Sequence, residues 1–265
     1  MYNPFQLGVK YIRYFFSAMN GKGHGVHSPF VYDFIEKVLN NRSSVQYFNT
    51  IEQKRETFRA DKTVLKLQDY GAGSRISSTS ERTVKKIASS SLKPKKFGQL
   101  FFKIVQHYQY KSVVELGTSL GISTAYFAMA NKEGKVFTFE GAEAVAALAE
   151  KNFQQLGLNN IEIIRGNFDE TLLPFLSTIR QLDVVYIDGN HRYEPTIRYF
   201  LEMLPKMNEY GMMILDDIHW SSEMEKAWQW VQQHEAVTAT IDLFFIGIVL
   251  FRKEFKIKQH FTVRF

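Results

Sequence analysis

Three aspartates follow apolar runs in the sequence, and their positions suggest metal or acid–base chemistry. Asp188 ends the run LDVVYID, and Asp216 and Asp217 end the run GMMILDD. If these runs are neighbouring parallel strands, their carboxylates converge outside the carboxyl edge of a sheet, where open α/β sheets bind ligands. Such a cluster needs protons or a cation to neutralise it, and an all-oxygen set suits Mg²⁺. The alternative is that Asp216 and Asp217 cap the helix that follows near Ser221.

Several histidines are candidates for chemistry in the same region. His191 lies shortly after the first of these aspartates, and an imidazole that titrates near neutrality can take a proton from a hydroxyl group. The alternative for a loop histidine is a surface or hydrogen-bonding role. His219 and Trp220 either line a pocket or begin the next helix. His24 and His27 lie in the glycine-rich segment GKGHGVHSPF, and without partner ligands we do not assign them to a metal site.

Two glycine turns compete for the role of a cofactor loop. In VVELGTSLGISTAYFA (113–128) an apolar run leads into Gly117 and Gly121, and a helical pattern follows. Such a turn brings backbone N–H groups and the positive end of a helix toward a ligand. LQDYGAGSRISSTS (67–80) has no comparable run before it, and its residues Ser78 to Glu81 predict a capping box for the helix ERTVKKIA. We therefore predict that the later turn binds the cofactor and that the earlier one is a loop.

The spacing of Glu115, Gly117 and Gly121 is E-x-G-x-x-x-G, which differs from the G-x-G-x-x-G of dinucleotide enzymes. It resembles motif I of class I S-adenosylmethionine-dependent methyltransferases. The segment KKFGQLFFKIVQHYQYKSVVELGTSLGISTAYFA (95–128) is similar to the entry helix and first strand-turn-helix of the catechol O-methyltransferase-like O-methyltransferases. The resemblance covers about residues 94–251 and implies methyl transfer from S-adenosylmethionine to a hydroxyl oxygen of a small-molecule acceptor.

The same resemblance implies which residues bind the cofactor. Glu140 ends the run KVFTFE and would accept hydrogen bonds from the ribose hydroxyls, although an acidic residue at the start of a helix is the alternative. Asn167 and Phe168 would hold the adenine, with Phe168 stacking on it or simply packing. The full set implied by the resemblance is Glu115, Gly117, Thr118, Ser119, Gly121, Ser123, Glu140, Gly141, Asn167, Phe168 and Asp188.

The resemblance also bears on the acceptor side. The family carries one Asp after the fourth strand and an Asp-Asn pair after the fifth, so Asp188, Asp216 and Asp217 correspond to ligands of Mg²⁺. Asp217 stands where the family has Asn, which adds negative charge and leaves open a metal-free branch. His191 stands where the family has a lysine that takes the proton of the acceptor hydroxyl. His191 and Asp188 are therefore the predicted catalytic residues.

The pattern of apolar runs predicts the α/β class. Runs expected as strands alternate with helical patterns after Pro94, and they are KSVVEL, KVFTFE, IEIIR, LDVVYID and GMMILDD. AVTATI and FFIGIVLFR should form an antiparallel hairpin. Together with the resemblance, this predicts a Rossmann-like methyltransferase sheet of about seven strands with helices on both faces in residues 94–265. Residues 1–93 look helical, as a cap or arm.

The composition of the chain limits which functional classes remain. The chain has 265 residues, 45% of them hydrophobic, with no cysteine and a net charge of +6. These values exclude disulfides and thiolate metal sites, and the absence of a long apolar run argues against a membrane span, so we expect a cytoplasmic protein. The positive charge keeps an RNA methyltransferase as an alternative, although the basic residues are dispersed. A non-catalytic scaffold with the same fold is a second alternative, and the resemblance implies a homodimer as one option.

Overall fold

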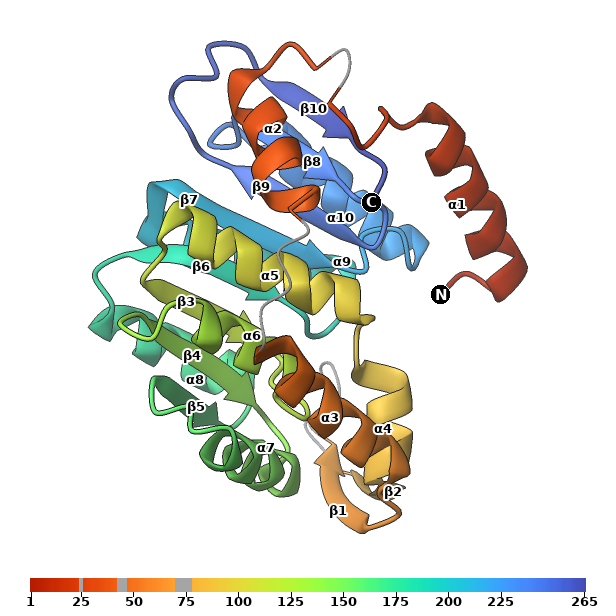
Figure 1. Cartoon of the computed structure of the whole chain (residues 1–265), viewed down its shortest axis with the longest axis vertical. Helices are drawn as coiled ribbons and strands as arrows, with labels where there is room; N and C mark the ends of the chain where they lie inside the picture. Colours follow the sequence, from red (N-terminus) through yellow and green to blue (C-terminus); the bar gives the residue numbers. More distant parts are fainter. Residues whose placement is uncertain (24–25, 42–46, 70–77) are drawn as a thin grey trace. The chain divides into compact units, whose positions relative to one another are not determined.

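The computed structural model describes residues 1–23, 26–41, 47–69 and 78–265, which belong to two compact units (Figure 1). One unit combines Met1–Asn41 with Gln181–Phe265, and the other is Arg42–Arg180. Each is described in turn. No helix among the described residues is long and apolar enough to cross a membrane.

The Arg42–Arg180 unit is built on three parallel strands, β3 (Ser112–Leu116), β4 (Lys135–Glu140) and β5 (Ile161–Arg165), in the order β3-β4-β5. Four helices alternate with them along the chain: α5 (Lys95–Tyr108), α6 (Ile122–Ala130), α7 (Glu143–Gln155) and α8 (Phe168–Thr178). Buried side chains fill β3 and most of β4, as parallel strands covered on both faces require. The three predicted strands are confirmed, and so is the glycine-containing turn that connects β3 to α6.

The same unit also contains α3 (Tyr47–Ala60), an antiparallel pair of strands, and α4 (Val84–Ser91). The strands are β1 (Val64–Asp69) and β2 (Ser78–Thr83). Here the sequence prediction is wrong, because a strand precedes the early glycine segment and residues 78–83 are a strand rather than the start of a helix. Residues 70–77, where the loop was predicted, lie outside the described residues. Helix α4 begins at Val84, capped by the Thr83 side chain, which accepts a hydrogen bond from the backbone N–H of Lys86 at 3.2 Å.

The other unit contains strands β6 (Leu182–Ile187), β7 (Met207–Asp216), β8 (Ala239–Asp242), β9 (Ile246–Leu250) and β10 (Gln259–Thr262). Their order is β10-β8-β9-β7-β6. Strands β6 and β7 are parallel, whereas β9 runs antiparallel to both β7 and β8. The predicted terminal hairpin is therefore confirmed, and β10 adds a strand parallel to β8 from the charged tail of the chain.

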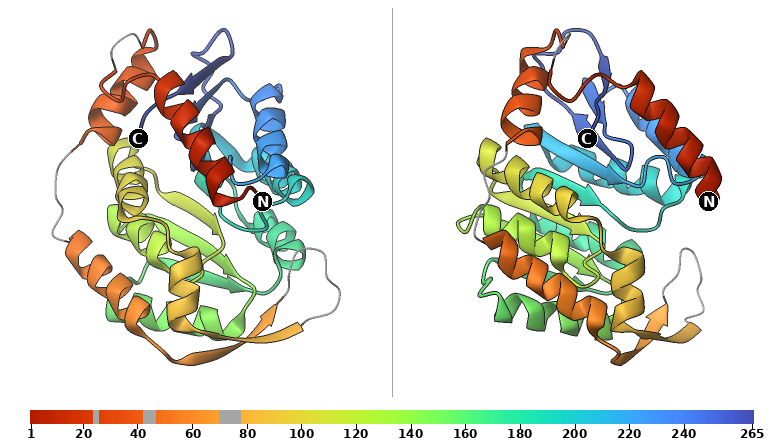
Figure 2. Two further views of the ribbon diagram at one scale, coloured as in Figure 1. Left: turned by 90° about the vertical axis from the view of Figure 1, so that its right-hand side faces the viewer. Right: turned by 45° about the vertical axis from the view of Figure 1, so that its right-hand side comes forward.

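Helices α9 (Tyr193–Met203) and α10 (Ser222–Gln233) contact each other, and a short 3-10 turn, η2 (Leu204–Lys206), follows α9. The N-terminal elements of this unit are α1 (Pro4–Ser17), α2 (Pro29–Asp33) and the π-helix η1 (Phe34–Leu39). The side chain of Ser28 caps α2, and Pro29 occupies the first position of the helix. Figure 2 shows α1, in red, beside the C-terminal strand, where Met19 forms a bridge with Val263. The division predicted near residue 93 stays a prediction.

Candidate functional site

The loop between β3 and α6 has an unusual backbone. Gly117, Ser119 and Gly121 have φ values of +107°, +47° and +74°, a region that glycine enters without steric cost and other residues rarely adopt. The N–H groups of Gly117 and Thr118 donate to the carbonyl of Phe139 at 3.1 and 2.9 Å. The loop is therefore fastened to the end of β4, and it leads directly into the N-terminus of α6.

Gly121 is required for a second reason, which is the close approach of α7. A Cβ atom at this position would lie 2.4 Å from the ring of Phe153, well inside van der Waals contact. The glycine thus allows the loop and α7 to pack together while α6 begins in a left-handed cap conformation. The sequence pattern predicts a glycine in this turn, but it does not show that Phe153 packs against it.

Glu115 lies beneath the loop and is fully buried. Its carboxylate accepts hydrogen bonds from the hydroxyls of Ser123 (2.5 Å), Thr124 and Thr138 (2.7 Å). Burial raises the pKa of Glu115 to about 7, although the three hydroxyl donors oppose the shift. Glu115 and Ser123 therefore hold β3, β4 and α6 together, and their predicted contact with a cofactor stays a prediction.

Glu140 joins the end of β4 to the glycine loop. One carboxylate oxygen accepts the N–H of Ser119 at 2.9 Å, and the other accepts the N–H of Ala142 at 2.9 Å. Burial raises the pKa of Glu140, and the backbone N–H donors oppose that shift. Because each carboxylate oxygen has two acceptor positions, the side chain keeps capacity for a ligand's hydroxyl groups. The sequence did not indicate Ser91, whose hydroxyl lies 2.7 Å from that of Ser119 and ties α4 to the loop.

Asn167 and Phe168 begin α8, directly after β5. The side chain of Asn167 caps the helix by accepting the N–H of Asp169 at 3.1 Å. The Phe168 ring is partly buried and meets Phe139 edge-on, with centroids 6.3 Å apart. Capping and packing account for these contacts, and the adenine-binding role stays a prediction.

In the other unit, the structure brings together Asp188, His191 and Asp216. One ligand atom from each lies within 4.8 Å of the others. His191 Nε2 is 3.6 Å from one oxygen of Asp188, whose other oxygen accepts the hydroxyl of Tyr186 at 3.0 Å. Asp216 is almost completely buried. Tyr186 was not predicted, but alternation along β6 places it on the same face as Asp188.

Asp217 does not belong to this cluster. Its φ of +53° turns the chain directly after β7, and its carbonyl accepts the N–H of Trp220 at 2.9 Å. The alternative that Asp216 and Asp217 cap α10 is wrong, because Ser221 is the N-cap and its side chain accepts the N–H of Met224 at 3.2 Å. His191, rather than Asp217, is the third member of the group.

Both ring nitrogens of His219 are engaged by acidic side chains. Nε2 is 2.8 Å from Asp242, and Nδ1 is 3.2 Å from Glu225. Burial disfavours the charged imidazolium, but the two carboxylates outweigh burial and raise the pKa of His219. Glu225 also accepts hydrogen bonds from the hydroxyl of Tyr2 at 2.7 Å and from Lys10 at 2.9 Å. His219 therefore fastens the loop after β7 to α10 and β8, and it does not begin a helix.

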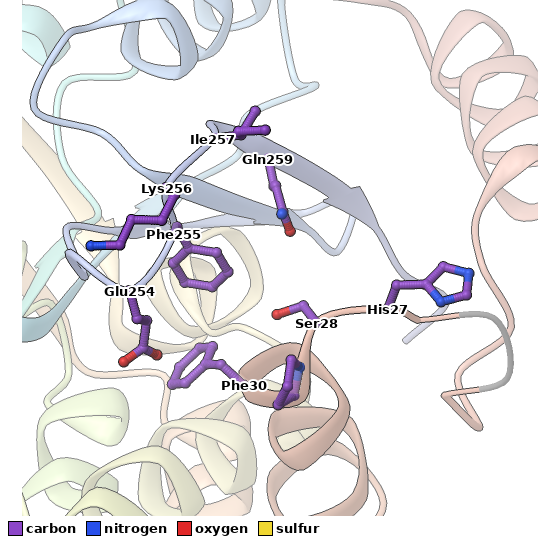
Figure 3. A pocket seen from close by; sticks show the side chains of 9 residues that line it. His27, Ser28, Phe30, Glu254, Phe255, Lys256, Ile257 and Gln259 are labelled. Atoms are coloured by element: carbon purple, nitrogen blue, oxygen red, sulfur yellow. The ribbon is translucent and has the colours of Figure 1, made fainter.

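A separate cavity of about 420 Å³ lies between the start of α2 and the segment before β10 (Figure 3). His27, Phe30, Phe255 and Gln259 are among its lining residues. The rings of Phe30 and Phe255 meet edge-on with centroids 6.0 Å apart. His27 is not part of the acidic cluster, and His24 lies outside the described residues.

Part of the chain is similar to known methyltransferases. Residues 114–218 match the family model of a methyltransferase domain. The chain is 32% identical over 124 residues to protein R132 of Acanthamoeba polyphaga mimivirus, covering 43% of this chain and 56% of that protein. It is 29% identical over 123 residues to a catechol O-methyltransferase of Niastella koreensis, covering 45% of this chain and 54% of the relative. The chain spans little more than half the length of the curated relatives it matches.

The structural similarity extends beyond residues 114–218. A methyltransferase of Podospora anserina, solved with S-adenosylhomocysteine, superposes with a TM-score of 0.60 at 12% identity, covering 85% of this chain and 97% of that one. This likeness confirms the predicted Rossmann-like methyltransferase sheet with its terminal hairpin. In the matched segment and in its fold, the chain is similar to class I S-adenosylmethionine-dependent methyltransferases of the catechol O-methyltransferase-like type.

Proposed function

We propose that this protein transfers a methyl group from S-adenosylmethionine to a hydroxyl oxygen of a small-molecule acceptor. The observation that carries the proposal is the loop after β3. Its left-handed residues and its fastening to Glu140 form a rigid turn at the N-terminus of α6, and the methyltransferase family model matches the segment that contains it. Rigid turns of this kind position a ligand at little entropic cost.

The residues around this loop fit an adenosyl cofactor. Glu140 is held by two backbone donors and retains acceptor positions for the two ribose hydroxyls. Gly117 and Gly121 keep the loop free of side chains that would stand between a ligand and the main chain. When bound, S-adenosylmethionine supplies a methyl group on a positively charged sulfur and leaves as the thioether S-adenosylhomocysteine.

The acidic cluster provides a proton acceptor for the acceptor hydroxyl. As the hydroxyl oxygen bonds to the methyl carbon, its proton must leave, and Nε2 of His191 is the group that we assign to take it. Asp188, whose oxygen lies 3.6 Å from that nitrogen, would stabilise the resulting imidazolium. The Tyr186 hydroxyl holds the other oxygen of Asp188 and so fixes the orientation of the carboxylate.

A metal ion is the competing use of the same three side chains. Asp188, His191 and Asp216 offer two carboxylates and one imidazole within 4.8 Å. Such a mixed oxygen and nitrogen set suits Mn²⁺ or another divalent transition metal better than Mg²⁺, which prefers oxygen ligands alone. A His191 nitrogen bound to a metal cannot accept a proton, so the two roles exclude each other for that atom.

Transfer of an isotope-labelled methyl group tests the proposal. The protein is incubated with labelled S-adenosylmethionine and, in separate reactions, with catechols, simple phenols or RNA, each with Mg²⁺, with Mn²⁺ or with a chelator. We expect label on the oxygen of a small hydroxyl compound. Label in RNA alone would replace the small-molecule acceptor with a nucleic acid, and cofactor binding without transfer to any acceptor would indicate the scaffold alternative.

A further inference from the structure

Helix α1 is fixed to its unit by one face. Tyr14 and Ala18 are buried there and pack against Phe244 of the turn between β8 and β9, with Leu7 and Tyr11 beside them. The rings of Tyr11 and Phe244 meet edge-on at 5.0 Å. The helix is also joined to α10 by ion pairing and hydrogen bonding, since Lys10 and Tyr2 both contact Glu225. α1 is therefore a docked helix whose orientation on this unit is defined.

The opposite face of α1 is apolar and exposed. Phe5, Ile12 and Phe16 have exposed fractions of 79%, 56% and 76%. Together with Gly8 they recur at intervals of three or four residues, which places them along one side of a helix. Figure 2 shows α1 at the surface of its unit. Large apolar side chains arranged in a row on a surface mark an interaction site more often than scattered ones do.

The charges next to this stripe are positive. The sequence of α1 contains no Asp or Glu, and Arg13 follows Ile12 on the exposed side of the helix. The guanidinium of Arg264 lies 4.6 Å from the ring of Phe15, next to the stripe. Glu225, the acidic residue that α1 contacts, is paired with Lys10 at 2.9 Å. The stripe thus presents apolar side chains flanked by cations.

We propose that this stripe, defined by Phe5, Ile12 and Phe16, docks the protein onto an anionic lipid surface. Helices with large aromatic and aliphatic residues on one face and basic residues beside them lie in the membrane interface, and anionic headgroups attract the cations. A helix of 14 residues is too short to span a bilayer, which requires about 20. The proposal therefore concerns surface attachment only.

A second copy of the chain suits this stripe less well than a lipid surface does. A twofold interface would place the same patch opposite itself, so the Arg13 and Arg264 side chains of both copies would approach each other. The three exposed side chains offer an area on the order of 400 Å², against the roughly 800 Å² per partner of a stable interface. A lipid surface has no such size requirement, and its charge complements these arginines.

Vesicle sedimentation tests the proposal with the full chain. The protein is mixed with vesicles of phosphatidylcholine alone or of phosphatidylcholine with phosphatidylserine, at low and high salt. We expect binding to the anionic vesicles that weakens as salt is added, because salt screens the arginines. The double substitution Phe5→Ser/Phe16→Ser should weaken binding at least tenfold, since each side chain transfers apolar area out of water. Arg13→Gln should weaken it about fivefold.

A matched control separates the stripe from general stickiness. Leu173, on α8, has the same exposed fraction as Ile12, 56%, so Ile12→Ser should weaken vesicle binding whereas Leu173→Ser should not. All these side chains are exposed, and thermal unfolding should be unchanged. Equal binding by wild type and the double variant would overturn the proposal. So would a concentration-dependent dimer that the double variant abolishes, without binding of wild type to vesicles, because the occupant would then be a second copy.

Discussion

The carboxylate of Glu140 accepts the backbone N–H of Ser119 at 2.9 Å, which connects the end of β4 to the middle of the glycine loop. Ser119 has a φ of +47°, a conformation that costs a non-glycine residue free energy and persists only when neighbouring contacts hold it. Glu140 supplies such a contact. The residue assigned to the ribose hydroxyls therefore also shapes the loop, and both roles depend on its charge.

Replacement of Glu140 by Gln should weaken the binding of S-adenosylhomocysteine by about 10- to 100-fold, since hydrogen bonds to a charged group contribute about 1.5–3 kcal/mol. The amide keeps one acceptor oxygen but sets an NH₂ group against a backbone N–H. Calorimetric titration measures the effect. Glu162→Gln is the control, because Glu162 is an exposed acid on β5 paired with Lys135. Similar affinities for the two variants would remove Glu140 from the binding site.

Alanine at Gly121 should destabilise the fold much more than alanine at Gly157. Both residues have a left-handed backbone, with φ of +74° and +66°, but a Cβ at Gly121 meets Phe153 at 2.4 Å whereas nothing lies within 4 Å at Gly157. The shared backbone cost is about 1–2 kcal/mol, and overpacking at Gly121 should add about 1–3 kcal/mol. Urea unfolding measures both values. Equal losses of stability in the two variants would show that α7 shifts to accommodate the new methyl group at little cost.

Glu115 should contribute less to the free energy of unfolding as pH rises from about 5 to about 8. Burial raises the pKa of Glu115 from 4.5 to about 7. The folded state therefore holds a proton that the unfolded state releases, so the stabilising contribution is complete below pH 4.5 and is lost as pH passes through 7. The difference corresponds to roughly 3 kcal/mol.

Glu115→Gln isolates this contribution. The amide oxygen can still accept hydroxyl donors such as Thr138, but it does not titrate. Chemical denaturation of both proteins at pH 5 and pH 8 should show a smaller pH dependence in the variant. An unchanged dependence would mean that Glu115 is ionised in the folded protein at both pH values.

Much of the fold was predictable because the central strands are continuous buried runs. β3 reads as a mostly apolar segment that ends before Gly117, and β6 as one that ends before Asp188, and this signal is local in sequence. The hairpin of β1 and β2 was missed for the opposite reason. The sequence of β2, STSERT, carries no apolar run, and its register, from Ser78 opposite Asp69 to Thr83 opposite Val64, depends on pairing across the chain. The local capping signal therefore gave the wrong element.

The sequence predicted where the acidic cluster lies, but it did not predict which three residues form it. Strand order brings Asp188 and Asp216 to the same edge because β6 and β7 are parallel neighbours. The side-chain direction of Asp217 depends on its φ of +53°, which no sequence pattern reports. The inclusion of His191 likewise follows from the path of the loop after β6. Residue types and spacing predict which strand ends meet, whereas side-chain directions depend on turns specific to this chain.

If the cluster holds a metal ion rather than a base, it should bind Mn²⁺ more tightly than Mg²⁺, because one of its three donors is an imidazole. Competition between the two ions, followed by the electron paramagnetic resonance of free Mn²⁺, measures the preference. Asp216→Asn should lower the affinity, whereas Asp169→Asn, at an exposed position on α8, should not. If Asp216→Asn binds Mn²⁺ as wild type does, the cluster is not a metal site, and the role of His191 as a base is favoured.

The most direct test of the central claim is a calorimetric titration of the wild-type protein with S-adenosylhomocysteine, with adenosine as the reference ligand. The rigid loop after β3 and the anchored Glu140 predict saturable binding of S-adenosylhomocysteine with one site per chain, and weaker binding of adenosine, which shares the ribose but lacks the amino-acid portion. Heats no larger than those of dilution for both ligands would contradict the assignment of this protein as an S-adenosylmethionine-dependent methyltransferase.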